Sequence, residues 1–423
     1  MEVANVIDEK KAKFMTPFEG SSALVDVRPE LKSAADLALT EIAVPTTRTE
    51  AWKYTRVGKI VNHDWNTNPS AAGDIKEITD LDAYRAIFVN GLCDASKSNL
   101  PTQVGVTCQL LSEASDALQQ MGELSDHHSD WFEALNMRYA QEGVALSVEA
   151  NTTLDKPLYI VHYTDNTDVA AINRHLIQVA RGANAEVIVH YVSNQSAKSF
   201  QSCVIESFVA ENAELQIDKI QEEMTGESYV HATEWTKQAR DSRFNIRTVT
   251  LSGQWVRNNL NIRVAGENCE THLFGTYMPR AKEHVDNHTM VDHLVPHCES
   301  NEVYKGIVTD KATAVFNGKV YVRLDAQKTN AFQQNANIVL SDDAHMYSKP
   351  ELEIYADDVK CSHGSTTGQF DEEAVYYLRA RGIGEASARK LLVQAFIKEI
   401  VEAIGDDAVR EYCLNRLEER LDQ

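Results

Sequence analysis

Apolar and polar side chains alternate with a period of two in many short runs between residues 143 and 370. Ala185, Val187, Val189 and Tyr191 share one parity, for example. Later runs with the same alternation are Ala213, Leu215 and Ile217, then Phe244, Ile246 and Thr248, then Leu260, Ile262 and Val264. Alternation in short runs predicts half-buried β-strands. An Asn-Gly pair, typical of tight hairpins, occurs in this region only at Asn317-Gly318, which argues against an up-and-down sheet.

A three-residue pattern recurs where several of these runs begin. Asn184-Ala185-Glu186, Asn212-Ala213-Glu214 and Asn268-Cys269-Glu270 lie at spacings of 28 and 56 residues, and Asp241-Ser242-Arg243 and His297-Cys298-Glu299 fall close to the same register. A fixed period of this size indicates a solenoid, in which each coil buries its apolar face only against neighbouring coils. Chance is the alternative, because three-residue matches are common in a long chain.

Helical patterns precede and follow this region. The sequence predicts helices near 29–40 and 129–142 and a short strand at 86–89, and then helices at 371–381, at 385–404 and after Gly405. The apolar face of 385–404 includes Leu391, Leu392, Phe396 and Ile400, which either pack on the parent domain or bind a partner. We therefore expect three domains: a mostly helical N-terminal domain at 1–142, a β-solenoid at 143–370 and a C-terminal helical domain at 371–423.

Composition and charge narrow the functional classes. Of the 423 residues, 43% are hydrophobic, and the formal net charge is −22. Such a negative chain repels phosphate backbones and anionic lipids, so neither a nucleic acid nor a membrane is the expected partner. No export signal is apparent at the start, and no run approaches the roughly 18 apolar residues of a membrane span. The seven cysteines form no Cys-x-x-Cys pair, which fits a reducing cytoplasm.

Motifs for nucleotide chemistry and hydrolysis are absent from the sequence. There is no phosphate-binding loop of the G-x-x-x-x-G-K-[ST] type, no G-x-G-x-x-G, no G-x-S-x-G and no H-E-x-x-H. We expect this chain not to hydrolyse ATP by itself.

One cluster of metal-ligating residue types lies at 284–298. It contains His284, Asp286, His288, Asp292, His293, His297 and Cys298. These side chains suit zinc or iron. On a strand, however, His284 and His288 point to one side and His293 to the other, so a bend is needed to bring them together. The alternative is a set of polar residues stacked along successive coils.

A second candidate site is the Cys-x-His pair formed by Cys361 and His363. On an extended strand the two side chains share one face, and a thiolate and an imidazole suit iron. Lys360 is expected to favour the thiolate form of the neighbouring cysteine.

Three stretches, read together, resemble one known family. They are residues 45–55, residues 286–300, and residues 357–369 continuing into 377–383. They resemble the SufB/SufD family of the SUF iron–sulfur cluster assembly system, over roughly residues 45–396. Within the family the chain is similar to the SufD branch, because it is short, lacks clustered cysteines near its front and contains the segment Lys360-Cys361-Ser362-His363-Gly364.

The resemblance implies a right-handed parallel β-helix flanked by α-helical N- and C-terminal domains. It also implies a non-catalytic subunit that pairs with a SufB-like paralogue through β-helix edges and docks a SufC-like ABC ATPase through residues 371–423. ATP is then bound only by that partner, and a homodimer of the isolated chain is a further expectation. His363, and second Cys361, are implied as ligands of a transient iron–sulfur cluster at the subunit interface. Nothing in the sequence speaks for or against a flavin.

Two other classes compete with this interpretation. Parallel β-helices also act as polysaccharide lyases and hydrolases, a role for which Asp286, Asp292, Asp342 and Asp343 are the available carboxylates. A zinc-dependent enzyme built on the 284–298 cluster is the other alternative.

Overall fold

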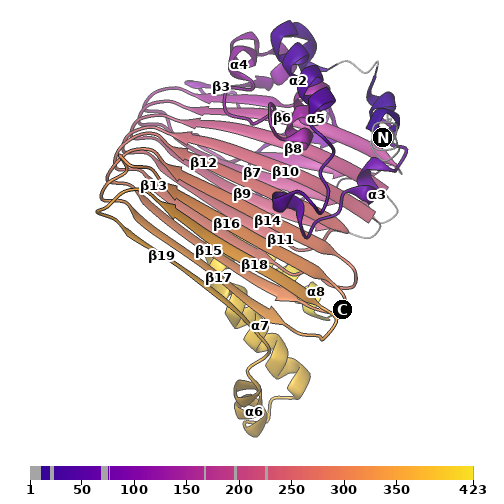
Figure 1. Cartoon of the computed structure of the whole chain (residues 1–423), viewed down its shortest axis with the longest axis vertical. Helices are drawn as coiled ribbons and strands as arrows, with labels where there is room; N and C mark the ends of the chain where they lie inside the picture. Colours follow the sequence, from indigo (N-terminus) through magenta and orange to yellow (C-terminus); the bar gives the residue numbers. More distant parts are fainter. Residues whose placement is uncertain are drawn as a thin grey trace.

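Two long, mainly parallel β-sheets face each other and form a solenoid of about seven turns (Figure 1). The computed structural model describes residues 11–19, 23–67, 75, 77–165, 168–194, 198–223 and 227–422. Residues 1–10, on which the expectation of no export signal depends, lie outside this set. Helical regions flank the solenoid at both chain ends, so the predicted parallel β-helix with helical terminal regions is confirmed.

Each coil contributes one strand to each sheet. The ten-stranded sheet contains β1 (Tyr84–Val89), β2 (Leu92–Cys93), β5 (Leu158–Thr164), β7 (Asn184–Ser193), β9 (Glu214–Glu223), β11 (Arg243–Thr250), β13 (Glu270–Tyr277), β15 (Glu299–Val308), β17 (Asn330–Val339) and β19 (Lys360–Gly368). The nine-stranded sheet contains β3 (Val106–Leu110), β4 (Val144–Val148), β6 (Val169–Val179), β8 (Lys198–Val209), β10 (Glu227–Gln238), β12 (Trp255–Val264), β14 (His284–His293), β16 (Thr313–Val322) and β18 (His345–Ile354).

The turn from the nine-stranded to the ten-stranded sheet explains the sequence repeat. In successive coils this turn contains a residue with φ between 55° and 68°, at Gly182, Asn212, Asp241, Asn268, His297 and Lys328. Asn and Asp tolerate the left-handed conformation better than most residues do. From Asn212 onward the predicted repeat therefore matches the coils. The first triplet is two residues out of register, because Asn184 pairs with Glu214 and not with Asn212.

The solenoid interior is packed by side chains that alternate in size between coils. Tyr304 is the register partner of Gly275, and Tyr277 is the register partner of Gly306. A Cβ on either glycine would overlap the ring of its partner tyrosine. The phenol of Tyr277 reaches past Gly306 and donates a hydrogen bond of 2.6 Å to Asn337 Oδ1, two coils farther along. Glycine in one coil thus provides the space for tyrosine in the adjacent coil.

The N-terminal region covers the outer face of the nine-stranded sheet (Figure 1). Its helices are α2 (Pro29–Glu41), α3 (Gly58–Val61), α4 (Ser115–Gln120) and α5 (Trp131–Tyr139), with 3-10 turns at Thr16–Phe18, Leu24–Val27, Glu50–Trp52 and Leu111–Glu113. Its strands β1 and β3 also extend the two sheets. A buried ion pair joins this region to the solenoid, because Glu206 lies 2.7 Å from Arg174 and accepts hydrogen bonds from the backbone of Gly122 and Leu124.

The segment at residues 50–55 crosses several coils on the same outer face. Trp52 stacks on Trp255, with a ring separation of 6.4 Å, and Arg257 lies over its ring. Farther along the solenoid, Tyr54 stacks on Tyr347 of β18 at 3.9 Å. This stretch of the family resemblance therefore attaches the N-terminal region to the solenoid.

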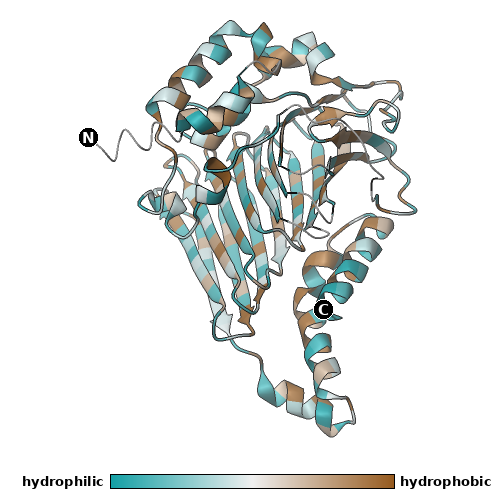
Figure 2. Ribbon diagram, turned by 90° about the vertical axis from the view of Figure 1, so that its right-hand side faces the viewer, coloured by the Kyte–Doolittle hydropathy of each residue, from teal (hydrophilic) through white to brown (hydrophobic). Residues whose placement is uncertain are grey.

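The C-terminal helices lie against the outer face of the ten-stranded sheet (Figure 2). They are α6 (Glu372–Ala380), α7 (Glu385–Glu402) and α8 (Asp407–Asp422), in good agreement with the predicted helices. Helix α7 packs across β11, β13 and β15, whereas α6 projects beyond the last strands. Among the residues described, no helix is long and apolar enough to cross a membrane.

The Gly–Tyr alternation predicts a specific loss of stability. Gly275→Ala places a methyl group against the Tyr304 ring in a closed interior, and overpacking of this kind costs about 1–3 kcal/mol. Gly364→Ala is the matched control, because no atom lies within 4 Å of the added carbon. Urea unfolding followed by circular dichroism measures both variants. Equal stability of the two variants would contradict the packing described here.

Candidate functional site at the open end of the solenoid

The two ends of the solenoid differ in how far they are covered. At the first end, strands β1 to β3 and the helical N-terminal region close the coil. At the other end β18 and β19 are the terminal strands of their sheets, and most of their side chains are exposed or half-buried. Edge strands present unpaired backbone groups that can pair with another chain. The last coil therefore exposes both a strand edge and the interior-facing positions of the solenoid.

Cys361 and His363 lie on this last coil, in β19. They are register partners of Ala331 and Gln333, whose side chains are buried in the solenoid, so both point to the interior face of the sheet. The predicted sharing of one face is thus present. Cys361 is half-buried, and His363 is exposed. Next to them, Ser365 and Ser348 make a hydrogen bond of 2.7 Å between the two sheets.

The structure favours the neutral thiol of Cys361, whereas the sequence predicts that Lys360 favours the thiolate. Burial raises the pKa of Cys361, and a hydrogen bond from the backbone of Ala331 offsets this only in part. Lys360 lies on the opposite face of the strand, so its ammonium group does not face the thiol. In the isolated chain Cys361 is a neutral thiol at neutral pH, and the expected effect of Lys360 is wrong.

The candidate metal cluster at 284–298 does not converge. His284 and His288 lie on the outer face of β14, where Asp286 pairs with Arg257 and lies 3.1 Å from His288 Nε2. His293 faces the interior, 2.9 Å from Ser300 Oγ, and His297 is the left-handed residue of a turn. The residues of this cluster are therefore divided between two faces and a turn. This arrangement favours the alternative to a metal site, in which polar residues stack along successive coils.

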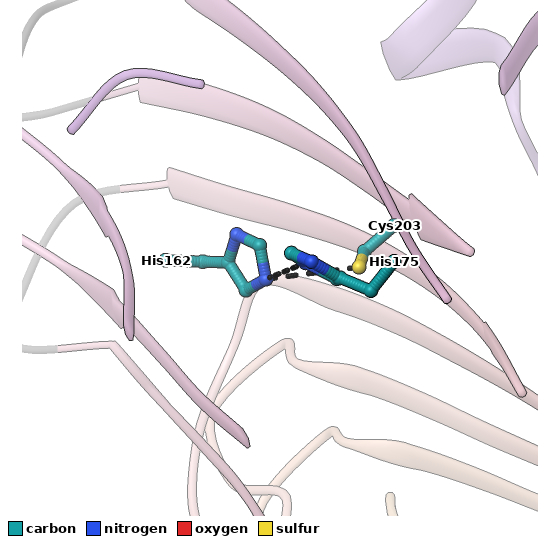
Figure 3. Close-up of side chains that lie close together, drawn as sticks. All are labelled: His162, His175 and Cys203. Atoms are coloured by element: carbon teal, nitrogen blue, oxygen red, sulfur yellow. Dashed lines mark hydrogen bonds between the residues drawn. The ribbon is translucent and has the colours of Figure 1, made fainter. Parts of the chain in front are cut away.

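Another group of metal-ligating side chains lies deep inside the solenoid. His162 of β5, His175 of β6 and Cys203 of β8 meet across the interior, with their ligand atoms within 4.8 Å of one another (Figure 3). The two imidazoles approach at 3.1 Å between their Nε2 atoms, and Cys203 Sγ lies 3.7 Å from His162 Nε2. Burial lowers the pKa of His162 to about 3 and raises that of Cys203 to about 12, so all three groups are neutral.

Hydrogen bonding assigns this trio a structural role. The backbone N–H of Val144 donates to His175 Nδ1 at 3.0 Å, which places the proton of that ring on Nε2. This Nε2–H then donates to His162 Nε2, so the ring nitrogens that face each other are already engaged. A metal ion would have to break this chain and remove a proton from a thiol of high pKa. No sequence motif indicates the trio, because only the coil register brings its members together.

The predicted partner-binding residues of α7 divide into two groups. Leu391 is 47% exposed, and Leu392 is half-buried. Phe396 is half-buried beneath the Lys305 ammonium group and packs on the core between the C-terminal helices and the sheet, and Ile400 is fully buried. Phe396 therefore helps to attach α7 to the solenoid and Ile400 is inaccessible, while Leu391 remains accessible.

A buried carboxylate attaches α8 to the same sheet. Glu222 of β9 accepts a hydrogen bond from Tyr412, lies 2.7 Å from Arg416 Nε and lies 3.2 Å from His190 Nε2. Burial by itself raises the pKa of Glu222, but His190 and Arg416 outweigh it and lower the pKa to about 2. The carboxylate is thus held ionised, and its charge joins the helix to the sheet.

Family models match most of the chain. A model described as SUF system FeS cluster assembly, SufBD core domain, matches residues 162–396. A model described as SufBD protein N-terminal region matches residues 19–160.

Full-length relatives have names that agree with these models. The chain is 32% identical over 397 residues to the iron–sulfur cluster assembly protein SufD of Escherichia coli, covering 90% of each chain. It is 31% identical over 425 residues to an iron–sulfur cluster assembly SufBD family protein of Synechocystis, covering 95% of this chain and 92% of the relative. A SufBD family protein of Mycobacterium leprae is 28% identical over 417 residues, covering 96% and 97%.

The attachment of α8 predicts a pH-dependent contribution to stability. Because the folded pKa of Glu222 is about 2, below its ordinary value of 4.5, its contribution is complete above pH 4.5 and is lost as the pH falls toward 2. At pH 7, Glu222→Gln should cost about 3 kcal/mol of unfolding free energy. The difference from the unmodified chain should shrink below about pH 4.5.

Glu419→Gln is the control for this measurement. Glu419 is an exposed partner of the same Arg416, so its loss should have little effect at any pH. A deficit for Glu222→Gln that stays constant down to pH 3 would contradict the pKa of Glu222.

Proposed function

This chain belongs to the SufBD family of the SUF iron–sulfur cluster assembly system, and from that premise we propose that it is the SufD-like, non-catalytic subunit of a SufBCD-type complex. In this proposal it pairs with a SufB-like paralogue and docks a SufC-like ABC ATPase. The observation that carries the proposal is the open end of the solenoid, where Cys361 and His363 lie side by side on one inward-facing strand surface.

The open end suits a shared cluster site better than a site within one chain. His363 is exposed on a terminal strand, so a second chain that pairs along β19 reaches it directly. A thiolate and an imidazole are suitable iron ligands, but two ligands from one chain leave most positions of an iron site open. We assign His363 as the first ligand from this chain and Cys361 as the second. Deprotonation of Cys361 is then coupled to metal binding, because the thiol is neutral in the isolated chain.

The ATPase is proposed to dock on α6 and the accessible side of α7. Tyr376 and Tyr377 of α6 are 73% and 56% exposed. The exposed Leu391 lies on α7, the next helix along the chain, which contacts α6. Aromatic side chains are enriched in the apolar centre of protein interfaces, and an exposed leucine beside them adds apolar area.

The attachment of α7 to the solenoid offers a route for ATPase motion. Lys305 of β15 lies 2.6 Å from Glu399 and over the ring of Phe396. A displacement of α7 therefore acts directly on β15, which lies two strands from the open end of its sheet. In the proposed mechanism, nucleotide-driven dimerisation of the ATPase shifts α7 and β15 and thereby changes access to the cluster site.

The remaining assignments follow from family membership. We propose a cytoplasmic location, a cluster that is transient in the complex, and ATP bound only by the partner. The free edge of β19 also supports a homodimer of the isolated chain, formed by the same kind of edge pairing.

The role of His363 is tested by His363→Ala. The variant should recover both partners normally, because the side chain is exposed and its removal leaves no cavity in the solenoid interior. Cluster formation on the purified complex, followed by visible absorption under anaerobic conditions, should fall at least about tenfold. His345→Ala is the control, since His345 is an exposed histidine of β18 at the same end. Normal cluster yield from His363→Ala would reject the ligand assignment.

The docking surface is tested by co-purification with co-expressed partners. Leu391→Asp places a charge at the centre of the proposed surface and should lower recovery of the ATPase about tenfold while the SufB-like partner remains bound. Leu414→Asp is the matched control, because Leu414 is 39% exposed on α8. Deletion of 371–423 is a less clean test, since it uncovers the apolar face of the ten-stranded sheet. Equal ATPase recovery by the two variants would reject this surface.

A further inference from the structure

Glu302 of β15 is a buried carboxylate without a cationic partner among the described residues. It is 2% exposed and faces the solenoid interior. Other buried carboxylates each contact a cation: Glu206 with Arg174, Asp218 with Arg247, Glu222 with Arg416, Glu234 with Lys219, and Asp286 with Arg257. Glu133 instead accepts hydrogen bonds from the Asp126 backbone and the Trp235 indole. A buried glutamate is rarely left without such a partner.

The surroundings of Glu302 are rich in oxygen atoms. Gln333 Nε2 donates a hydrogen bond of 2.7 Å to Glu302 Oε2. In the part of the chain that the structure describes, Glu302 Oε1 and Gln333 Oε1 have no hydrogen-bond partner, and the Thr289 hydroxyl is buried next to the Glu302 carboxylate. All three side chains are at least nine-tenths buried. These buried oxygen atoms offer lone pairs that a cation or an ordered water molecule can use.

Two neighbouring features define the shape of this region. Thr289 of β14 and Gly318 of β16 are register partners on the opposite sheet, and a Cβ at Gly318 would overlap the Gln333 amide. Gly318 therefore leaves room for the Gln333 side chain between the sheets. Burial raises the pKa of Glu302 to about 7, against smaller lowering effects from Thr289 and Gln333, which places the Thr289 hydroxyl beside the carboxylate. A nearby cation would remove this destabilisation of the charged form.

The region is close to the open end of the solenoid. Along one line of interior positions, Glu302 is followed by Gln333 and then by the exposed His363. Adjacent strands lie about 4.8 Å apart, so Glu302 is roughly 10 Å from the edge of the last coil. The oxygen atoms are therefore within reach of an ion that enters past His363.

We propose that Glu302, Gln333 and Thr289 form a buried binding site for one hard divalent cation, with His363 at its mouth. A carboxylate, an amide oxygen and a hydroxyl are the ligands that Mn²⁺, Mg²⁺ and Fe²⁺ accept, and water completes the coordination. The identity of the biological ion rests on the proposed function: in a cluster assembly subunit it is Fe²⁺, held next to the site where the cluster forms. Glu302, Gln333 and Thr289 thus hold the substrate iron close to His363, on the interior side of it.

The test measures Mn²⁺ binding to the isolated full-length chain by electron paramagnetic resonance, with anaerobic Fe²⁺ titration in parallel. The unmodified chain should bind one Mn²⁺, and Glu302→Gln should weaken this binding at least about tenfold. Gln333→Glu adds a second carboxylate and should tighten binding about tenfold or more. It should also show a thermal midpoint that rises when Mn²⁺ is added. Glu353→Gln, on the outer face of β18 where Glu353 pairs with Lys319, is the control and should leave binding unchanged.

Three results would overturn the site. The first is the absence of Mn²⁺ binding to the unmodified chain together with no Mn²⁺-dependent stabilisation of Gln333→Glu, which means that the oxygen atoms hold only water. The second is binding that survives Glu302→Gln but is lost in His363→Ala, which places the ion at the surface. The third is equal weakening of Mn²⁺ binding by Glu302→Gln and Glu353→Gln. That result would mean that the negative charge of the whole chain attracts Mn²⁺ and that no specific site holds it.

Failure of this site and failure of the proposed function are distinguishable. The Mn²⁺ measurement needs neither partner and no cluster, and thermal unfolding of Glu302→Gln in the absence of metal checks that the variant folds. A chain that binds Mn²⁺ through Glu302 but recovers no partner keeps the site and rejects the complex. A chain that recovers both partners but binds no Mn²⁺ keeps the complex and rejects the site.

Discussion

Parallel stacking of one coil on the next is the constraint on which the rest of this protein depends. The register of each ladder places interior side chains of successive coils directly above one another, as with Tyr277 and Gly306. An interior residue therefore has to match the residues one coil before and one coil after it in both size and hydrogen bonding. The Tyr–Gly alternation solves the size requirement, and hydrogen bonds such as Asn258 to Asn287, at 2.9 Å, solve the polar one. At the last coil the requirement ends, because β18 and β19 have no following coil.

This difference between the ends explains where accessible chemistry lies. The trio of His162, His175 and Cys203 has suitable metal-ligating atoms but lies near the covered end, where hydrogen bonds from Val144 and between the rings satisfy it. Cys361 and His363 have the same residue types at the uncovered end, where the imidazole of His363 is exposed and the thiol of Cys361 is half-buried. Similar donor sets thus differ in accessibility, and the distance from the open end decides which set a ligand can reach.

Local patterns predicted the elements well, whereas long-range register decided the sites. Period-two alternation and helical spacing predicted the parallel β-helix, helix α2 and the three C-terminal helices, because each pattern reflects burial of one face of one element. The same reasoning placed Cys361 and His363 on one face. It gave the wrong effect for Lys360, since a neighbour in sequence lies on the other face of a strand. It also missed the Glu302–Gln333 pair, whose members are joined only by the stacking of β15 and β17.

The position of Glu302 combines the cost of a buried charge with access to solvent. In a solenoid, each coil is stabilised mainly by its immediate neighbours, so the terminal coil has the fewest stabilising contacts and opens at the lowest free energy. Opening of β18 and β19 uncovers Gln333 of β17, the interior position between the edge and Glu302 in this line, without disturbing the coils near the N-terminal region. A carboxylate placed deeper would require several coils to open, and one placed in β19 would be solvated and would not select a cation by desolvation. Burial two strands from the edge is therefore the arrangement in which an ion can enter by local opening and still be held in a region of low dielectric constant.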